Sequence, residues 1–218
     1  MTEGSLCVNV GCGSTPTAGW RNLDNSPTVL LARAPALAGL AMRAGALGKY
    51  QRSFVEAVQR SGIRWANGAR HIPVPDGGAR VVYSSHMIEH LDPAAARRFL
   101  DEVRRVLRPG GIARIVAPDL MRLARAYVDR GDADRFGAAT LLAADPPVGL
   151  RGRLRLATLG PRGHAWMYDS VSLVALLRDR GFTDARALPP GITGIPDPGA
   201  LDLHERADES IFVEGTRA

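Results

Sequence analysis

Short, β-rich apolar runs alternate with amphipathic helical patterns along most of the chain. The runs with the composition of strands are 6–10, 22–24, 63–66, 80–84, 112–117, 183–188 and 210–215. The helical patterns lie at 28–60, 93–108, 120–130 and after Ser170, which we expect to cap its helix. Because strands that alternate with helices form parallel sheets, the sequence predicts an α/β fold with a doubly wound, mostly parallel sheet.

The length of 218 residues favours a single domain, residues 1–218, because two typical domains need a longer chain. Two stretches exceed the usual connection between a strand and a helix: 28–60 and 120–163. We interpret them as helical cap insertions or as contacts of a homodimer.

Hydrophobic residues make up 45% of the chain and charged residues 23%, which are globular proportions. The most apolar stretch, 28–47, is interrupted by Arg33, Pro35 and Arg43, whereas a membrane span needs about 20 uninterrupted apolar residues. No basic and apolar leader opens the sequence. We therefore expect a cytoplasmic protein with no membrane partner, in which Cys7 and Cys12 stay reduced.

The formal net charge of +6 raises the question of nucleic-acid binding. Lys49 is the only lysine, and the arginines alternate with Asp and Glu along helical patterns such as 97–108. Such alternation is typical of a solvated helix face. We predict no nucleic-acid partner, and a silent nucleic-acid-binding module is disfavoured for the same reason.

A glycine loop follows the first strand, and a carboxylate ends the second. Gly11-Cys12-Gly13 would let the backbone approach a ligand, and Asp24 could accept hydrogen bonds from ribose hydroxyls. An ordinary turn is the alternative interpretation. A dinucleotide site needs a third glycine where Pro16 stands, and a full helix after the loop. The pattern therefore favours a ribose-bearing ligand without a diphosphate over a nicotinamide cofactor.

Five motifs occur in an order shared with a known family. They are Val8–Gly13, Asp24, Ile72–Gly78, Ser84–Leu91 and Glu102–Gly111. In order and spacing they resemble the class I S-adenosylmethionine-dependent methyltransferases. His164–Asp169 and the helix after it resemble small actinobacterial saccharide O-methyltransferases, which act in polysaccharide synthesis. The resemblance implies a Rossmann-like fold with S-adenosyl-L-methionine as the cofactor.

The same resemblance implies which residues bind that cofactor. Gly11, Cys12 and Gly13 would lie beside its methionine part, and Asp24 and Asn25 beside its ribose. The remaining residues implied are Asn67, Gly68, Ala69 and Arg70 at the adenine, and Ser85 after the fourth strand. Family members often have an aspartate at or next to position 68, and this chain has Asn67 and Gly68 instead.

Residues 86–90 read His-Met-Ile-Glu-His, which is also the spacing of a helical zinc motif. Only two residues separate this segment from the helix start at Asp92-Pro93, so we interpret the match as coincidental. His90 is explained equally well as a residue that ties the turn to the backbone. The sequence leaves the metal question open: Mg²⁺ would suit a sugar methyltransferase, but no ligand set is evident.

Two histidines are candidates for the base that removes the acceptor proton. His86 follows a strand whose carboxyl end lies near the switch point of the sheet, and Glu89 could orient its imidazole. His164 lies after the second insertion, where a cap would bring it over the acceptor. Cofactor packing is the alternative role for His86.

Three further residues are candidates for binding the acceptor. Trp166 and Tyr168 could form a platform for a sugar ring, although aromatic residues at this spacing are also typical of a core. Asp119 could bind a hydroxyl or a cation, or cap the helix at Leu120.

The sequence therefore predicts an O-methyltransferase acting on a hydroxyl of a small molecule, with a mannoside-type saccharide as the expected acceptor. An N- or C-methyltransferase of a secondary metabolite is one alternative. A nicotinamide-dependent oxidoreductase is an alternative of another class.

Overall fold

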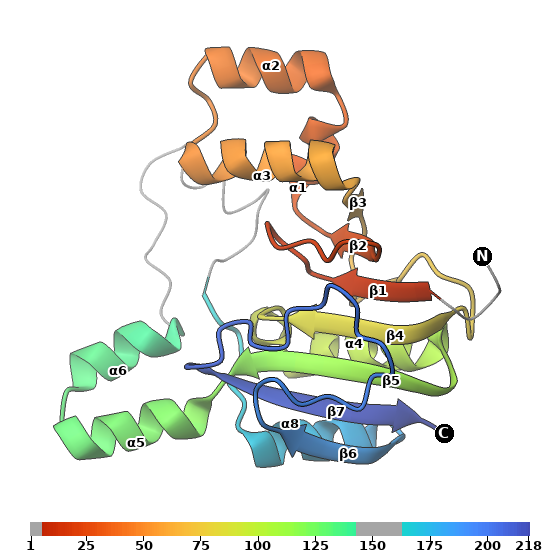
Figure 1. The fold of residues 1–218 in the computed structure, drawn as a ribbon. Helices are drawn as coiled ribbons and strands as arrows, with labels where there is room; N and C mark the ends of the chain where they lie inside the picture. The colour runs from red at the N-terminus through yellow and green to blue at the C-terminus, as the bar shows by residue number, and fades with distance from the viewer. Residues whose placement is uncertain (1–5, 143–162) are drawn as a thin grey trace.

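Seven strands form one sheet in the computed structural model, which describes residues 6–142 and 163–218 (Figure 1). The strands are β1 Leu6–Val10, β2 Arg21–Asp24, β3 Arg64–Trp65, β4 Ala79–Ser85, β5 Leu107–Pro118, β6 Phe182–Leu188 and β7 Ser210–Arg217. Their spatial order is β3-β2-β1-β4-β5-β7-β6. All pairs from β3 to β5 are parallel, and β7 is antiparallel to both β5 and β6. The predicted mostly parallel sheet is confirmed.

This topology fixes where a ligand can bind. Connections run from β1 to β2 on one side and from β3 to β4 on the other, so the order reverses beside β1. Ligands of such sheets bind beyond the carboxyl ends of the strands at that reversal. These ends point toward the left of Figure 1, where helices α5 and α6 project from the sheet.

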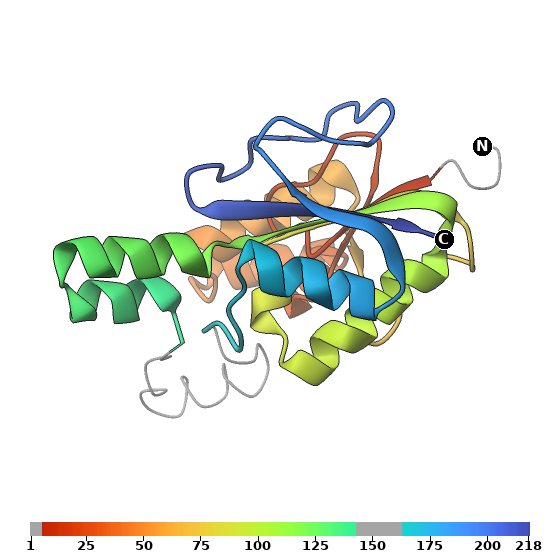
Figure 2. The ribbon, with the colours of Figure 1, turned by 90° about the horizontal axis from the view of Figure 1, so that it is seen from below.

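The helices form layers and caps around the sheet. They are α1 Pro27–Ala32, α2 Pro35–Arg43, α3 Lys49–Ser61, the 3-10 turn η1 Ile88–His90, α4 Pro93–Val106, α5 Leu120–Arg130, α6 Ala133–Thr140 and α8 Ser170–Asp179. Apolar residues of α4 and α8 pack on one face of the sheet and form the main core (Figure 2). Helices α1–α3 stand beyond the β3 edge with an apolar cluster of their own.

An irregular segment, residues 189–209, covers the opposite face of the sheet where a doubly wound fold usually has a helix (Figure 2). The cause is local: residues 11–20, after β1, form a loop without a helix, as their shortness and Pro16 predict. Ile195 and Leu201 fill the apolar space left over Tyr83. Glu205 accepts hydrogen bonds from the Tyr83 hydroxyl at 2.6 Å and the Thr15 hydroxyl at 3.3 Å.

Helix ends follow local capping chemistry, with one correction to the sequence prediction. Asp92 caps α4 by accepting from the amide of Ala95 at 2.8 Å, and Pro93 takes the first helical position, as predicted. Helix α8 is capped by Asp169 and not by Ser170. The Asp169 carboxylate accepts from the amide of Ser172, whose hydroxyl accepts in turn from the amide of Asp169.

Both cysteines are buried and free, which confirms the prediction that they are reduced. Cys12 packs in the apolar cluster beneath α1–α3. Burial raises the pKa of both thiols above the ordinary cysteine value, with the Asp24 carboxylate adding to the rise at Cys12. Cys12 is therefore a packing residue of the glycine loop and not a nucleophile. Among the described helices, none is both long and apolar enough to cross a membrane.

Candidate active site

The glycine loop turns sharply at the carboxyl end of β1. Gly11 has φ +73°, and its amide donates to the carbonyl of Leu23 in β2 at 2.8 Å. A Cβ atom at Gly11 would lie 2.5 Å from Cγ of Met87, so no side chain fits there. Gly13 has φ +49° and faces open space. The loop therefore presents bare backbone toward the end of the sheet, which suits a ligand lying against it.

Asp24 ends β2 directly beside this loop. One carboxylate oxygen accepts from the amide of Gly13 at 3.0 Å, and the other accepts from the amide of Ser26 at 2.8 Å. Burial raises the pKa of Asp24 above the ordinary value, and these two amides oppose the rise. Each oxygen keeps acceptor capacity for a further donor. The pair of oxygens therefore fits the two hydroxyls of a ribose.

The turn after β3 lies beside the carboxyl ends of β1 and β2. The side-chain oxygen of Asn67 accepts from the amide of Ala69 at 3.1 Å, and the amide of Ala66 donates to the carbonyl of Asp24 at 3.0 Å. Gly68 is buried, and a Cβ atom on it would lie 2.6 Å from Val10. An aspartate at position 68 would therefore press against the side chain of Val10 in β1.

The remaining predicted cofactor residues lie around the same strand ends. The carbonyl of Asn25 accepts from the indole of Trp65 at 3.0 Å, which joins the ends of β2 and β3. Arg70 is exposed on the turn after Asn67. Ser85 ends β4, and its buried hydroxyl has no hydrogen-bond partner among residues 6–142 and 163–218.

His86 follows β4 in a left-handed conformation, with φ +48°, which turns its imidazole away from the path of the strand. Its Nε2 lies 2.8 Å from the hydroxyl of Ser210, at the start of β7. Its Nδ1 lies 3.4 Å from a carboxylate oxygen of Glu89, whose side chain is only 1% exposed. This contact is longer than a hydrogen bond; in the tautomer with its proton on Nδ1, that proton faces the carboxylate and Nε2 carries the lone pair.

Two more histidines complete the group. The rings of His90 and His164 meet edge to face, with centroids 5.2 Å apart. His164 is placed by the chain before α8, because the amides of Ala165 and Trp166 both donate to the carbonyl of Glu89, at 2.7 and 3.1 Å. Burial lowers the pKa of His164 below the ordinary value, although the nearby Glu89 carboxylate opposes that shift.

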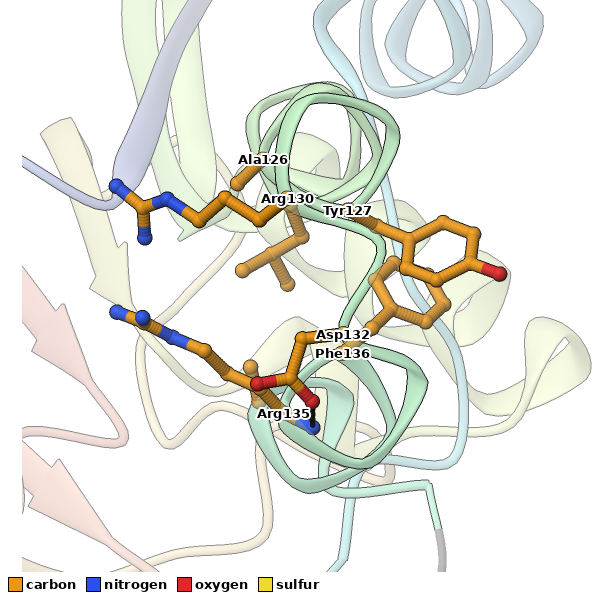
Figure 3. A pocket seen from close by; sticks show the side chains of 8 residues that line it. Ala126, Tyr127, Arg130, Asp132, Arg135 and Phe136 are labelled. Carbon is orange, nitrogen blue, oxygen red and sulfur yellow. Dashed lines mark hydrogen bonds between the residues drawn. The ribbon is translucent and has the colours of Figure 1, made fainter.

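A cavity of about 560 Å³ opens over these residues, between the strand ends, helices α5 and α6, and the 189–209 segment. Its polar lining includes His86, Glu89, His90, Arg122, His164 and Arg206. A cleft of about 180 Å³ adjoins it between α5 and α6, where Arg130 and Arg135 extend side by side (Figure 3). Tyr127 and Phe136 pack on the other side of that cleft.

Comparison with known proteins decides the class. Residues 8–115 match the family model of a methyltransferase domain. The matched residues form a class I S-adenosylmethionine-dependent methyltransferase domain. The match spans β1 to β5 and so includes the glycine loop, Asp24 and His86. No curated protein sequence matches this methyltransferase.

Solved structures have the same fold at low sequence identity. A methyltransferase from Thermotoga maritima, described as a possible histamine N-methyltransferase, is 14% identical with a TM-score of 0.51, over 100% of this chain and 84% of that one. A methyltransferase from Methanosarcina mazei is 18% identical with a TM-score of 0.51, over 100% and 94%. SibL is 19% identical with a TM-score of 0.45 over 98% of this chain, and this chain spans only half of SibL, 50%.

Of the three residues predicted to bind the acceptor of this methyltransferase, only Asp119 lines the cavity. Asp119 lines the cavity and also caps α5, accepting from the amide of Met121 at 3.0 Å. Tyr168 is buried in the main core and does not line the cavity. Its burial raises the pKa of the phenol to about 12. Trp166 is 49% exposed beside the cluster and is also outside that lining.

Sequence reasoning missed several cavity residues. Ser210 is an ordinary serine at a strand start, and only the pairing of β7 with β5 brings it to His86. Three arginines of the lining cannot be told apart in the sequence from the many others dispersed along the chain: Arg122, Arg130 and Arg206. The one available signal was the spacing along α5, where residues 122, 126 and 130 recur on one helical face.

Proposed function

We propose that this methyltransferase moves the methyl group of S-adenosylmethionine to a hydroxyl oxygen of a small saccharide. The observation that carries the proposal is the position of His86. It lines the cavity, and the next residue, Met87, packs its side chain against Gly11 of the glycine loop. His86, a proton acceptor in the cavity, is therefore the chain neighbour of a residue that contacts the glycine loop.

The cofactor, when bound, would supply a methyl group on a sulfonium sulfur. The acceptor oxygen would attack the methyl carbon in line with the carbon–sulfur bond, and the sulfur would leave. As the carbon–oxygen bond forms and the carbon–sulfur bond breaks, the acceptor hydroxyl must lose its proton. Nε2 of His86 carries the lone pair that receives this proton, with the acceptor hydroxyl taking the place of the Ser210 hydroxyl. Glu89 stabilises the resulting imidazolium through Nδ1. S-adenosylhomocysteine and the methyl ether are released.

The lining of the cavity favours a polyhydroxylated acceptor. Its volume of about 560 Å³ lies within the roughly 300–1,000 Å³ of small-molecule sites. Carboxylates, imidazoles and guanidinium groups all line it, so hydroxyl groups that both donate and accept hydrogen bonds can find partners there. An apolar secondary metabolite would leave these groups unpaired at a cost of roughly 1–3 kcal/mol each.

The proposal is tested by incubating the protein with methyl-labelled S-adenosylmethionine and a panel of mono- and oligosaccharides, with matched amino compounds alongside. We expect label in a methyl ether and equimolar S-adenosylhomocysteine. Label on nitrogen alone would assign the alternative N-methyltransferase. Calorimetry with NADH and S-adenosylhomocysteine in parallel completes the test, because binding of NADH alone would overturn the methyl-transfer proposal.

Asp24→Asn is expected to weaken binding of S-adenosylhomocysteine by roughly 10–100-fold, because hydrogen bonds to a charged group contribute about 1.5–3 kcal/mol. The NH₂ group of the new asparagine would also face one of the two backbone N–H groups that donate to Asp24, so two donors would oppose each other. Isothermal titration calorimetry measures the change. Asp76→Asn, which neutralises an exposed carboxylate paired with Arg105, is the matched control and should bind like the wild type. Equal affinity in the two variants would remove Asp24 from the ribose site.

A further inference from the structure

Glu89, His90 and His164 form a compact cluster at the floor of the cavity. Each offers one ligand atom, and these atoms lie within 4.8 Å of one another. Glu89 and His90 come from η1, whereas His164 comes from the segment before α8. The two hydrogen bonds from the amides of Ala165 and Trp166 to the carbonyl of Glu89 hold the two segments together. The cluster is therefore built by the fold.

The carboxylate of Glu89 lacks the partners that burial demands. Its side chain is 1% exposed, and neither oxygen accepts a hydrogen bond from any residue in the described ranges. An ionised carboxylate removed from water is costly unless a cation or hydrogen-bond donors compensate for it. Nδ1 of His86, at 3.4 Å, faces only one of the two oxygens. The second oxygen has no donor of its own within the described ranges.

Both histidines of the cluster have Nδ1 occupied. His90 Nδ1 lies 3.1 Å from the carbonyl of Gly163, and because a carbonyl only accepts, the proton of this imidazole is on Nδ1. His164 Nδ1 lies 3.1 Å from the sulfur of Met167, a weak acceptor. A neutral imidazole with its proton on Nδ1 presents the Nε2 lone pair; the His164 ring also lies beside the carbonyl of Thr140, with which an ion would compete. Metal-binding histidines are oriented by the same kind of contact at the other ring nitrogen.

We propose that Glu89, His90 and His164 bind a divalent transition-metal ion, with Zn²⁺ as the best-fitting probe. Two imidazoles and one carboxylate suit Zn²⁺ and its neighbours, whereas Mg²⁺ prefers oxygen ligands alone. Tetrahedral Zn²⁺ with bonds of about 2.0–2.1 Å places two coordinated imidazole centroids roughly 5 Å apart. The observed separation of 5.2 Å matches this spacing. The ligand atoms, which lie within 4.8 Å of one another, would close to roughly 3.3 Å around such an ion.

Three protein ligands leave a fourth position of the ion open toward the cavity. An oxygen bound there, from water or from the acceptor, would have a lowered pKa and a fixed position beside His86. Ion binding itself does not depend on the proposed methyl transfer, whereas this use of the ion rests on it. The helical zinc motif considered from the sequence pairs His86 with His90. The fold instead directs His86 to Ser210 and supplies His164 as a ligand.

The test is calorimetric titration of chelator-treated protein with Zn²⁺, Mn²⁺ and Mg²⁺, repeated for Glu89→Gln, His90→Ala and His164→Ala. We expect one Zn²⁺ per chain and affinity lowered roughly 100-fold or more in each variant, since even outer contacts of such ligands change affinity about 10–100-fold. His71→Ala is the matched control, because His71 is an exposed histidine that also lies beside a glutamate, Glu102.

His90 is exposed, so His90→Ala keeps the test decisive if a variant at a buried ligand fails to fold. Visible absorption of the Co²⁺-loaded protein gives a second readout, and a tetrahedral spectrum lost in His90→Ala supports the site. Absence of Zn²⁺ binding, or equal affinity in His90→Ala and the wild type, would overturn it. S-adenosylhomocysteine binding in the same samples reports on the proposed function separately.

Discussion

Replacing His86 by asparagine is expected to lower kcat for methyl transfer by roughly 10²–10⁴-fold, the usual contribution of a positioned general base. Affinity for S-adenosylhomocysteine should stay at the wild-type value, because His86 lies on the cavity side of Met87 and not in the glycine loop. Asparagine is chosen because position 86 has φ +48°, a conformation that asparagine tolerates and alanine does not.

The size of this effect follows from the surroundings of the ring. Nδ1 faces the Glu89 carboxylate at 3.4 Å and Nε2 lies 2.8 Å from the Ser210 hydroxyl, so the ring is already positioned and only the Ser210 contact has to be exchanged for the acceptor. An asparagine amide can occupy the same space and hydrogen-bond to Ser210, but it has no group that takes a proton near neutral pH. The variant therefore separates proton transfer from packing.

Single-turnover kinetics with a saturating acceptor measure the change in the chemical step. His71→Asn introduces the same substitution at an exposed histidine and should leave kcat unchanged. If His86→Asn binds S-adenosylhomocysteine normally and turns over like the wild type, His86 is a packing residue. In that case His164, the other candidate base in the cavity, is tested by the same substitution in chelator-treated protein.

The sheet could be predicted because its signals are local. Residues 6–10 and 80–84 are apolar over lengths typical of buried strands, and Asp92-Pro93 marks the start of α4 by chemistry within a few residues. Residues 189–209 could not be placed in the same way. They have no periodic pattern, and their two buried residues, Ile195 and Leu201, are covered only because no helix follows β1.

The cluster at the cavity floor shows the limit of motif reading. Residues 86–90 match a helical zinc motif, and the match is interpreted as coincidental because this segment lies between a strand and the helix start at Asp92-Pro93. The structure has a 3-10 turn there, which buries Glu89 and leaves His90 exposed. His164, which lies far along the chain, completes the group. A ligand set divided between two segments is determined by tertiary structure, so the sequence spacing alone gave no basis for assigning it.

A buried ion pair fixes the segment that replaces the missing helix. Nη1 of Arg114, in β5, lies 2.7 Å from the carboxylate of Glu214, in β7, and both side chains are at most 5% exposed. Glu214 also accepts from the hydroxyl of Thr193 at 2.6 Å and from the amide of Gly194 at 2.7 Å. The same carboxylate therefore neutralises a buried guanidinium and anchors the 189–209 segment to the sheet.

Glu214→Gln is consequently expected to lower the free energy of unfolding by about 3–5 kcal/mol, the usual cost of removing one partner of a buried ion pair. The loss arises because the Arg114 guanidinium stays buried without a counter-charge, and Nε and Nη2 of that side chain already have no partner in the described part of the chain. Denaturant unfolding followed by circular dichroism measures it. Glu209→Gln disrupts the exposed pair with Arg206 and should cost less than about 1 kcal/mol.

The double variant Arg114→Met with Glu214→Gln distinguishes an uncompensated charge from a general loss of packing. Removing both charges together should recover at least about half of the stability lost in Glu214→Gln, since apolar replacement of a buried pair is often neutral. No recovery would mean that the anchoring of Thr193 and Gly194 dominates. Arg206 and Glu209 line the cavity from the anchored segment. Loosening of that segment in Glu214→Gln should therefore also raise KM for the acceptor while leaving S-adenosylhomocysteine affinity unchanged.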